Sequence, residues 1–398
     1  MSINENALKT KGTNILVGVC ILLALIGLGL WAYQLTAGLQ VTNMRNLESW
    51  GLYITNFMFF IGLSAGGLII SSVPRVFGVE GFGGISKIAV WTSICCTVIA
   101  ASFVVIDLGN PLRLWELLVF SNMTSPLMWD IFVITAYLIL SVFYLVMMIR
   151  SEQNKVSQSA LRIVSTIALI LAVLVHSVTA WIFALQNAHG MWNTAIMAPW
   201  FVSSALVSGL ALVMVVVIAL RKVGYLELDS KYLVKMGKFL GVFCCIDLFF
   251  FGCDLLTEAF PGGHSADIAT MIMFGPLAPF FWTEVIGCVV AIVVGFVPSL
   301  RRPSLYVVAG IAAMIAIFCK RCQIILGGFT PKNIDLVTAA PTYPLTDLGA
   351  QIHAMVPSLV YFPTPLEFMV VIAMCALGVA ALVLGLRFLP LKPTENTH

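Results

Sequence analysis

The stretch CCIDLFFFGCDLLTEAF, residues 244–260, is almost entirely apolar, yet it carries the acidic side chains of Asp247, Asp254 and Glu258. On an α-helix each residue advances by about 100°, so a spacing of seven returns to nearly the same face and a spacing of four adds only about 40°. The three carboxyl groups therefore share one side of an apolar helix. Such a helix is too hydrophobic for the surface of a soluble protein, and its acidic stripe needs polar partners in an apolar interior.

The rest of the chain has the same character. It has 398 residues, of which 60% are hydrophobic and only 10% are charged, and its mean hydropathy is +1.03. Soluble domains of this length do not have that composition, so we predict an all-α polytopic membrane protein. A spanning helix needs about 20 apolar residues. Ten transmembrane helices are predicted, at about 14–36, 50–73, 84–108, 126–149, 160–186, 197–220, 233–259, 276–299, 303–325 and 364–389.

Basic residues are divided unevenly between the two sides of the predicted membrane. With the N-terminus inside, sixteen Lys and Arg residues fall on the inner side, and five fall on the outer side: Arg45, Arg113, Lys320, Arg321 and Lys332. Cytoplasmic loops are normally enriched in Lys and Arg. We therefore predict that both termini are cytoplasmic.

Several landmarks recur at intervals of about 150 residues. Trp50 and Trp200 open the second and sixth spans, and Pro111 and Pro261 follow the third and seventh. Because four spans separate equivalent points, the two halves would have the same orientation. We predict two four-helix bundles in a parallel repeat, flanked by one helix at each end. The regions are 1–49 (tail and first helix), 50–186 (bundle A), 187–325 (bundle B), 326–363 (extracytoplasmic docking loop) and 364–398 (last helix and C-terminal tail).

Two outer segments have features of a docking surface. The connection 326–363 contains five prolines, and a connection of that length without a regular pattern is commonly a binding surface. The segment NPLRLWELLVFSNMTSP, residues 110–126, contains a short amphipathic run that suits a helix lying at the membrane interface or against a partner. We predict that a partner protein docks here, with these candidate contacts: Arg113, Glu116, Arg321 and Lys332.

Ionisable residues inside the spans are candidates for function, because each costs at least about 3 kcal/mol near the bilayer centre. They gather in the outer half of the membrane, with Asp247 the deepest acid. The set is Asp107, Asp130, His176, Asp247, Asp254, Glu258, Glu284 and Glu367. Asp130 and Glu367 stand near the starts of their spans, where a carboxylate can equally well cap the helix.

The histidines and cysteines argue against a metal cofactor in this chain. Of the five histidines only His176 lies within a predicted span, and one histidine cannot ligate a b-type haem from both sides. The sequence CKRC at 319–322 has a metal-like spacing, but it lacks a second pair, and an iron–sulfur cluster needs four ligands. We therefore expect no haem and no metal bound by this chain.

A histidine, carboxylates and aromatic rings in an apolar surrounding suit a quinone. Its ring and tail can be buried, its oxygens need hydrogen-bond partners, and each redox step moves two protons to or from titratable groups. The aromatic and amide candidates stand at the start of the second span: Trp50, Tyr53 and Asn56. The small residues of GLSAGG, residues 62–67, favour close helix packing over ligand binding.

Three stretches resemble the NrfD family, the membrane subunits of polysulfide-reductase-like respiratory complexes. They are WGLYITNFMFFIGLSAGG at 50–67, DLGNPLRLWELLVFSNMTSPLMWDI at 107–131 and YFPTPLEFMV at 361–370. The resemblance covers nearly the whole chain, and ten spans look like the longer branch of the family, which includes hydrogenase, quinone-reductase and alternative-complex-III membrane subunits. Asn110 stands where the family usually has a basic residue before the proline, although Arg113 remains.

The resemblance implies a haem-free subunit in a bacterial or archaeal cytoplasmic (inner) membrane, which binds menaquinone or ubiquinone near the outer face. It implies a four-cluster ferredoxin-like iron–sulfur subunit docked on that face, and usually a molybdopterin catalytic subunit beyond it. It also implies quinol chemistry or proton transfer for Asp107, His176 and Asp254, and we expect Asp254 to face a polar cavity close to the other two. The proton-transfer candidates are Asp130, Asp247, Asp254, Glu258 and Glu284.

Two other classes of protein stay open. A proton-coupled secondary transporter could also have repeats and buried acids, but it would commonly show paired Gly or Pro breaks at mid-membrane, and no clear pair stands out. A structural membrane anchor without an active quinone site is the other alternative. His176→Ala separates the quinone interpretation from this anchor, because only a quinone-reactive subunit would lose quinol-coupled turnover while still assembling.

Overall fold

The computed structural model describes residues 5–44, 48–78, 82–187, 189–260, 262–329 and 361–391. Within these ranges the chain is helical, and ten of its helices are long and apolar enough to span a membrane. They are α1 (Lys11–Ala37), α2 (Leu52–Phe77), α3 (Ser86–Asp107), α5 (Pro126–Glu152), α6 (Gln158–Ala184), α7 (Met197–Lys222), α8 (Ser230–Ala259), α10 (Ala278–Phe296), α11 (Pro303–Phe329) and α14 (Pro365–Phe388). The predicted all-α membrane fold with ten spans is confirmed, and each predicted span matches one helix to within a few residues.

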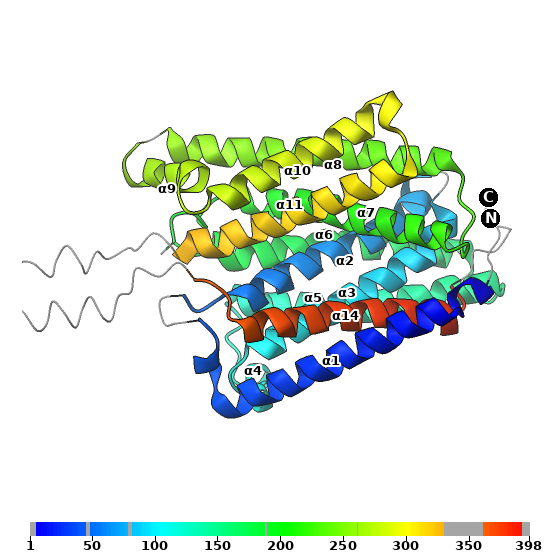
Figure 1. Cartoon of the computed structure of the whole chain (residues 1–398), viewed down its shortest axis with the longest axis horizontal. Helices are drawn as coiled ribbons and strands as arrows, with labels where there is room; N and C mark the ends of the chain where they lie inside the picture. Colours follow the sequence, from blue (N-terminus) through cyan, green and yellow to red (C-terminus); the bar gives the residue numbers. More distant parts are fainter. Residues whose placement is uncertain are drawn as a thin grey trace, which may run out of the picture.

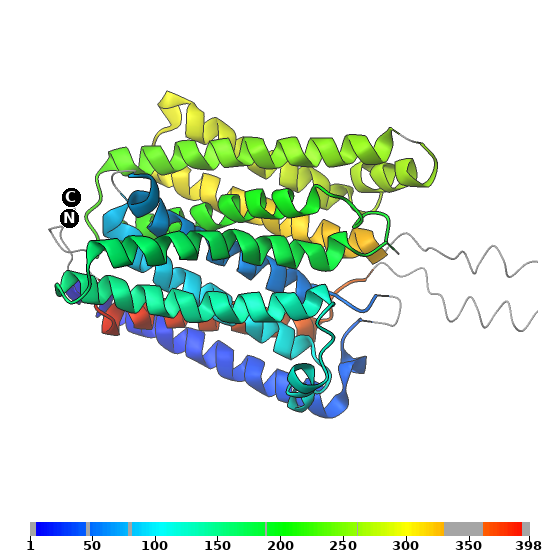
Figure 2. The same ribbon diagram turned by 180° about the vertical axis from the view of Figure 1, so that it is seen from behind.

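The long helices run side by side along one axis (Figures 1 and 2). The start of α1 and the end of α14 lie at the same end of the bundle. Two short helices, α4 (Glu116–Val119) and α9 (Gly263–Phe274), lie at the opposite end. We call this opposite end the α4–α9 end. It carries the sequence segments predicted to face outward, and its location outside the cytoplasm stays a prediction.

The helices pack in two groups that meet along α2 and α7. In the first group α2, α3, α5 and α6 contact one another, and in the second α7, α8, α10 and α11 do so. The groups are joined where α2 contacts α7 and α11, and where α6 contacts α7. The sequence repeat that would relate them, and the boundaries at 50–186 and 187–325, stay predictions. The predicted docking loop 326–363 lies mostly outside the described residues.

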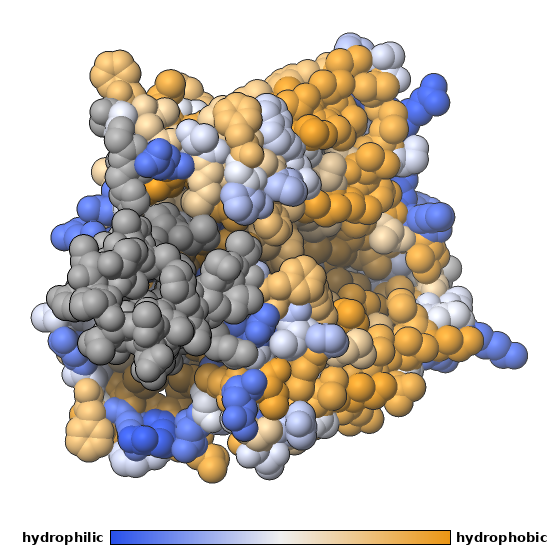
Figure 3. Space-filling view, turned by 60° about the vertical axis from the view of Figure 1, so that its left-hand side comes forward, coloured by the Kyte–Doolittle hydropathy of each residue, from blue (hydrophilic) through white to orange (hydrophobic). Residues whose placement is uncertain are grey.

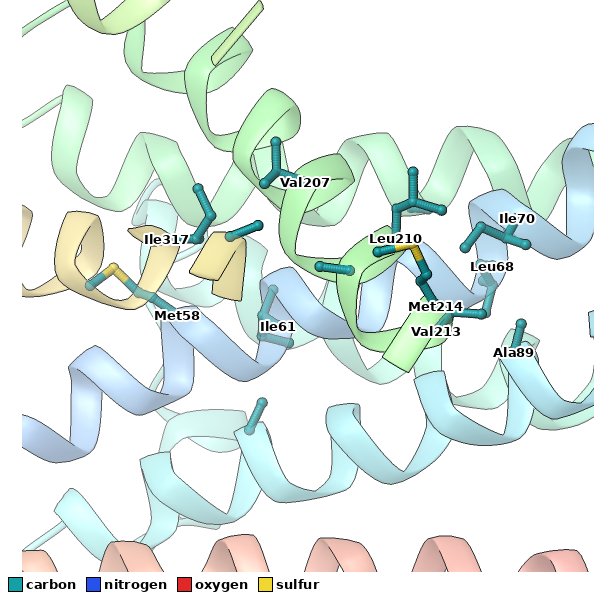
Figure 4. Packing of buried hydrophobic residues seen from close by; sticks show 14 of the residues in the cluster. Met58, Ile61, Leu68, Ile70, Ala89, Val207, Leu210, Val213, Met214 and Ile317 are labelled. Carbon is teal, nitrogen blue, oxygen red and sulfur yellow. The ribbon is translucent and has the colours of Figure 1, made fainter. Parts of the chain in front are cut away.

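Glycines bring α2 and α7 into backbone contact. A Cβ built on Gly66 would overlap the backbone of Gly209, and one built on Gly67 would overlap that of Ala89 on α3. The expected packing role of GLSAGG is therefore confirmed. Figure 4 shows the side chains buried around this seam, which come from α2 (Met58, Ile61, Leu68) and α7 (Val207, Leu210, Met214).

The surface of the bundle is hydrophobic along its length. Figure 3 shows apolar side chains over most of the visible flank, with hydrophilic ones nearer the ends. The helices α1 and α14 pack against each other, and α14 also contacts α3. Most of α1 stays exposed, with Ile15, Leu22 and Leu25 at least 59% exposed. In water these side chains would be costly, so this flank suits contact with lipid.

Candidate functional site

The acidic stripe of α8 faces a basic pair on α11. Lys320 Nζ donates to Asp247 Oδ1 at 2.6 Å, and both side chains are fully buried. Ser203 Oγ on α7 donates to the same oxygen at 2.7 Å, and the Lys320 ammonium lies 3.9 Å from the centre of the Trp200 ring. A charge this deep needs an opposite charge and hydrogen bonds to offset its lost hydration. The stripe is thus part of the bundle interior, as its periodicity predicts.

Arg321, the neighbour of Lys320, is also fully buried. One of its terminal nitrogens donates to Ser204 Oγ at 2.6 Å, and its guanidinium lies 3.9 Å from the centre of the Phe201 ring. The prediction that Arg321 contacts a docking partner is therefore wrong, because α11 continues to Phe329 and keeps this side chain inside the bundle. Lys320 and Arg321 also drop out of the outer set of basic residues, which leaves sixteen against three.

Two further acids belong to this cluster. Gln323 Nε2 donates to Glu284 Oε2 at 2.7 Å, and Glu284 lies within electrostatic range of Lys320 and Asp247. Asp254 is buried and interacts with Thr194, with Lys320 within electrostatic range. Glu258, one turn further along, is only half-buried. We name the following set the Lys320 cluster: Ser203, Ser204, Asp247, Asp254, Glu284, Lys320, Arg321 and Gln323.

Several buried atoms of the Lys320 cluster have no hydrogen-bond partner within the described part of the chain. The acceptors are Asp247 Oδ2, Asp254 Oδ1, Glu284 Oε1 and Gln323 Oε1, and the donors are Arg321 Nε and Nη1. Buried polar atoms are nearly always paired with protein or with ordered water. Donors and acceptors occur together here, so internal water can satisfy both.

A second cluster lies at the α4–α9 end, where α1, α2, α3 and α14 meet. Tyr53 Oη donates to Gln34 Oε1 at 2.8 Å, and Gln34 Nε2 donates to the carbonyl of Ile106 at 3.0 Å. Asp107, the last residue of α3, lies within electrostatic range of Tyr53 and Glu367. Its Oδ1 is buried, with no hydrogen-bond partner among the described residues.

Glu367 completes this cluster and also caps a helix. Thr364 and Glu367 form a reciprocal capping box at the start of α14, which confirms the capping interpretation of Glu367. Its other carboxylate oxygen accepts a hydrogen bond from Tyr361, whose Oη in turn accepts from the backbone N–H of Leu52 at 2.9 Å. Burial, with the hydrogen bond to Glu367, raises the pKa of Tyr361. We name the following set the Tyr53 cluster: Gln34, Tyr53, Asp107, Tyr361 and Glu367.

His176 and Asp130 form a third polar site, between α2, α5 and α6. Asp130 Oδ1 accepts from Thr179 Oγ1 at 2.6 Å, so Asp130 bonds to the neighbouring helix and does not cap its own. His176 Nδ1 lies 2.7 Å from the carbonyl of Ala172, and Nε2 lies 3.1 Å from that of Ile61. A neutral imidazole has one N–H and can donate to only one of these carbonyls.

The expected grouping of Asp107, His176 and Asp254 is wrong. Asp107 belongs to the Tyr53 cluster on α3, whereas Asp254 belongs to the Lys320 cluster on α8. His176 lies between them on α6, where its electrostatic neighbour is Arg321. The prediction relied on the similar depth of the three residues in the membrane, but depth does not determine which helices are adjacent. Asp107 therefore belongs to a different cluster from Asp254, and His176 borders the Lys320 cluster through Arg321.

Trp50 and Asn56, the other two predicted quinone-binding residues on this part of the chain, make packing and backbone contacts. Trp50 stacks on Trp192 at 6.0 Å between ring centres, within an aromatic group that includes Phe183. Asn56 donates to the carbonyl of Leu52 on its own helix at 2.8 Å. Among the described residues neither makes a hydrogen bond or aromatic contact with the Tyr53 cluster. Their assignment to a quinone stays a prediction.

The predicted docking segment is strongly exposed. Arg113 donates to both carboxylate oxygens of Glu116 at 2.8 Å, and these hydrogen bonds hold the pKa of Glu116 below its ordinary value. Leu112 and Phe120 beside them are 86% and 75% exposed. Lys332, the remaining docking candidate, lies outside the described residues. Docking itself stays a prediction.

Sequence reasoning missed Lys320 as a candidate site residue. Two adjacent basic residues stand inside the predicted span 303–325. Basic residues inside a span are rare without buried acids to pair with them, so the sequence does indicate a buried ion pair here. The two residues were instead counted with the basic residues of the outer side, near the end of that span. The flanking Cys319 and Cys322 are buried, and among the described residues no His, Cys, Asp or Glu side chains group in a way that could hold a metal.

Comparison with known proteins identifies the family of this chain. The model of the NrfD polysulphide reductase family matches residues 40–331, and the chain belongs to that family. It is 33% identical, over 94% of its length and 91% of the relative's, to a Halobacterium salinarum protein provisionally named as a membrane subunit of dimethyl sulfoxide reductase.

Two further relatives are named for other reductases. The chain is 25% identical to the Hdr-like menaquinol oxidoreductase integral membrane subunit of Archaeoglobus fulgidus, over 94% of its length and 93% of the relative's. It is 26% identical to a subunit of the selenate reductase of Mesobacillus selenatarsenatis, over 80% and 83%. The named substrates differ while the family is shared, so the family match defines a kind of subunit and no particular substrate.

Proposed function

We propose that this chain is the quinone-binding membrane subunit of a respiratory reductase complex. It would exchange electrons between menaquinol or ubiquinol in the membrane and an iron–sulfur partner docked at the α4–α9 end, with a molybdopterin catalytic subunit beyond. The observation that carries the proposal is the Tyr53 cluster, which gathers proton-carrying groups where the exposed segment after Asp107 begins. The names of the relatives support the same function, because one specifies menaquinol and each specifies a reductase or an oxidoreductase.

The residues of the Tyr53 cluster suit a quinone ring. A quinol oxidised there would give two electrons to the partner and two protons to side chains, and a quinone reduced there would take both back. Asp107 Oδ1 has no partner within the described ranges and can accept a proton or hydrogen bond from a ring hydroxyl. Tyr53 and Gln34, both almost fully buried, can hold a ring oxygen in place.

The Lys320 cluster suits proton transfer. It holds acids and bases that are buried together, and it reaches from Asp254, near the α4–α9 end of α8, inward to Asp247. Its unpaired donors and acceptors are compatible with a chain of water molecules along which protons move. His176, an electrostatic neighbour of Arg321, and Asp130, which accepts a hydrogen bond from Thr179 on the same helix as His176, would extend such a route toward bundle A. We propose that this route accompanies the redox reaction.

The test is quinol-dependent electron transfer in membranes that contain the complex. Tyr53→Phe removes one hydroxyl, and Asp107→Asn removes one titratable group with little change in size. We expect each to lower turnover by at least about tenfold, as loss of a positioned proton acceptor commonly does, while the iron–sulfur partner still co-purifies. Asp229→Asn, in an exposed ion pair with Lys231 at the other end of the bundle, is the control. Full turnover in both site variants would favour a structural anchor.

A further inference from the structure

A hydrophobic groove opens on the flank of the protein between α1, α3, α5 and α14. Its volume is about 590 Å³, and its lining is almost wholly apolar, with Leu25, Leu28, Trp31, Ala101, Val105 and Met374 among the residues. Along α1 the lining extends from Ile21 to Trp31, a distance of about 15 Å at the usual helical rise. The groove is therefore long and narrow, and it runs parallel to the spanning helices.

One end of the groove leads to the Tyr53 cluster. On α1 the lining residue Trp31 is followed one turn later by Gln34, and on α3 the lining residue Ile106 is followed directly by Asp107. On α14, which runs the opposite way, Val370 is preceded one turn earlier by Glu367. All three steps lead toward the α4–α9 end. On all three helices, the apolar lining of the groove is therefore followed by a polar side chain at the same position along the bundle axis.

Polar atoms with unused hydrogen-bonding capacity mark this junction. The indole Nε1 of Trp31 and the Oδ1 of Asp107 are both buried, and neither has a hydrogen-bond partner in the part of the chain described. Gln34 already bonds to the backbone beside the groove, through the carbonyl of Ile106. The junction therefore offers a donor and an acceptor to a ligand whose polar head lies at the end of an apolar tail.

The charge of the junction selects among such ligands. A phospholipid would place an anionic phosphate beside the carboxyl groups of Asp107 and Glu367, and within the described ranges no Lys or Arg is an electrostatic neighbour of Asp107 that would offset the repulsion. A quinone head is neutral, and its oxygens accept or donate hydrogen bonds according to its redox state. We infer that the groove holds the isoprenoid tail of a quinone, which enters sideways from the bilayer and seats its ring at the Tyr53 cluster. This inference rests on the proposed function.

The groove would determine the position of the quinone more than it would raise the affinity of the protein for it. The tail leaves a lipid environment that is as apolar as the groove, so its transfer brings little hydrophobic gain. What the groove provides is a fixed path that aligns the ring with Tyr53 and Asp107. A bulky side chain in the groove should therefore displace the tail and, with it, the ring.

The experiment uses a menaquinone analogue that carries a photoactivatable diazirine on its tail, added to the intact complex in its membrane. Crosslinks mapped by mass spectrometry are expected on α1 between 21 and 31, on α3 between 98 and 106, and on α14 between 370 and 377. Excess menaquinone should abolish these crosslinks, whereas excess phosphatidylglycerol vesicles should leave them in place. Competition by the phospholipid instead would show that the groove is a lipid site and would overturn the inference.

Two variants make the test specific. Ala101→Trp fills the groove and should reduce the competed crosslinks by about tenfold or more, as expected for a direct steric block. Ala136→Trp places the same side chain on an exposed position of α5 outside the groove and should leave them unchanged. Leu377→Trp, at the exposed rim, gives a second groove variant should Ala101→Trp fold poorly. Unchanged labelling in the folded groove variants would refute the assignment.

The remaining outcomes separate this inference from the proposed function. Competed crosslinks on α7, α8, α10 or α11 would refute the groove but would keep a quinone-binding subunit. The absence of competed crosslinks anywhere on the chain would overturn both.

Discussion

The buried pair of Asp247 and Lys320 gives a stability prediction that can be worked from the structure. Lys320→Met keeps most of the volume of the side chain but leaves the Asp247 carboxylate buried, with Ser203 as its remaining hydrogen-bond donor. Removing one partner of a fully buried pair typically costs about 3–5 kcal/mol, because the other charge is left without compensation. The lost contact between the ammonium and the Trp200 ring adds about 2 kcal/mol, as is typical of such contacts when desolvated.

The double variant Asp247→Leu with Lys320→Met should recover most of that loss. It removes both charges, so the net charge of the Lys320 cluster is the same as in the wild type, and hydrophobic replacement of a buried pair is often neutral or stabilising. We expect a coupling free energy of at least about 2 kcal/mol between the two positions.

The assay is reversible unfolding in mixed micelles with increasing sodium dodecyl sulfate, followed by tryptophan fluorescence. Lys231→Met is the matched control, because Lys231 forms its ion pair with Asp229 in an exposed position, where solvent screens it, and no measurable change is expected. The reasoning would be refuted if Lys320→Met were as stable as the wild type. It would equally be refuted if the double variant lost the sum of the two single effects.

Three further predictions concern other parts of the molecule. Gly66→Leu should prevent folding, measured as monodisperse yield after detergent extraction, because no side chain fits against the backbone of Gly209; Gly18→Leu, where a Cβ meets nothing within 4 Å, is the control. Asp254→Asn should lower quinol-dependent turnover by at least about tenfold while the partner stays bound, if protons pass this carboxyl group, and wild-type turnover would make the residue structural. Arg113→Glu should release the iron–sulfur partner during affinity purification, and full retention would remove the segment after α3 from the docking surface.

Hydrophobicity predicted the ten helices, and hydrophobicity together with residue spacing predicted the inward direction of the acidic stripe. Both follow from local rules, since a run of about 20 apolar residues spans the bilayer and spacing by turns sets a helix face. The close packing at GLSAGG was predictable for the same reason, because small residues in a span permit backbone contact. These are properties that a segment has regardless of its neighbours.

The grouping of the polar residues could not be predicted in this way. Asp107 and Asp254 have similar depth in the membrane. However, Asp107 lies on α3, which packs against α14, whereas Asp254 lies on α8, which packs against α7, α10 and α11. Which helices become neighbours depends on tertiary packing, which a single sequence does not reveal. Lys320 and Arg321 were counted on the outer side because they stand near the outer end of their predicted span, where a charged side chain can normally reach the membrane surface. Instead, Lys320 pairs with Asp247 inside the bundle, where each charge stabilises the other.

The contact of Gly66 with Gly209 bears on how the protein can work. Backbone against backbone leaves no layer of side chains that could repack, so α2 and α7 resist sliding or tilting past one another. Alternating access in a transporter requires its two halves to rock about a central substrate, and such a motion would have to separate the backbones of α2 and α7 at this contact. We expect proton movement through stationary helices, by rotation of side chains and water. A change in spin-label distance across this seam on adding menaquinol would show that the halves move after all.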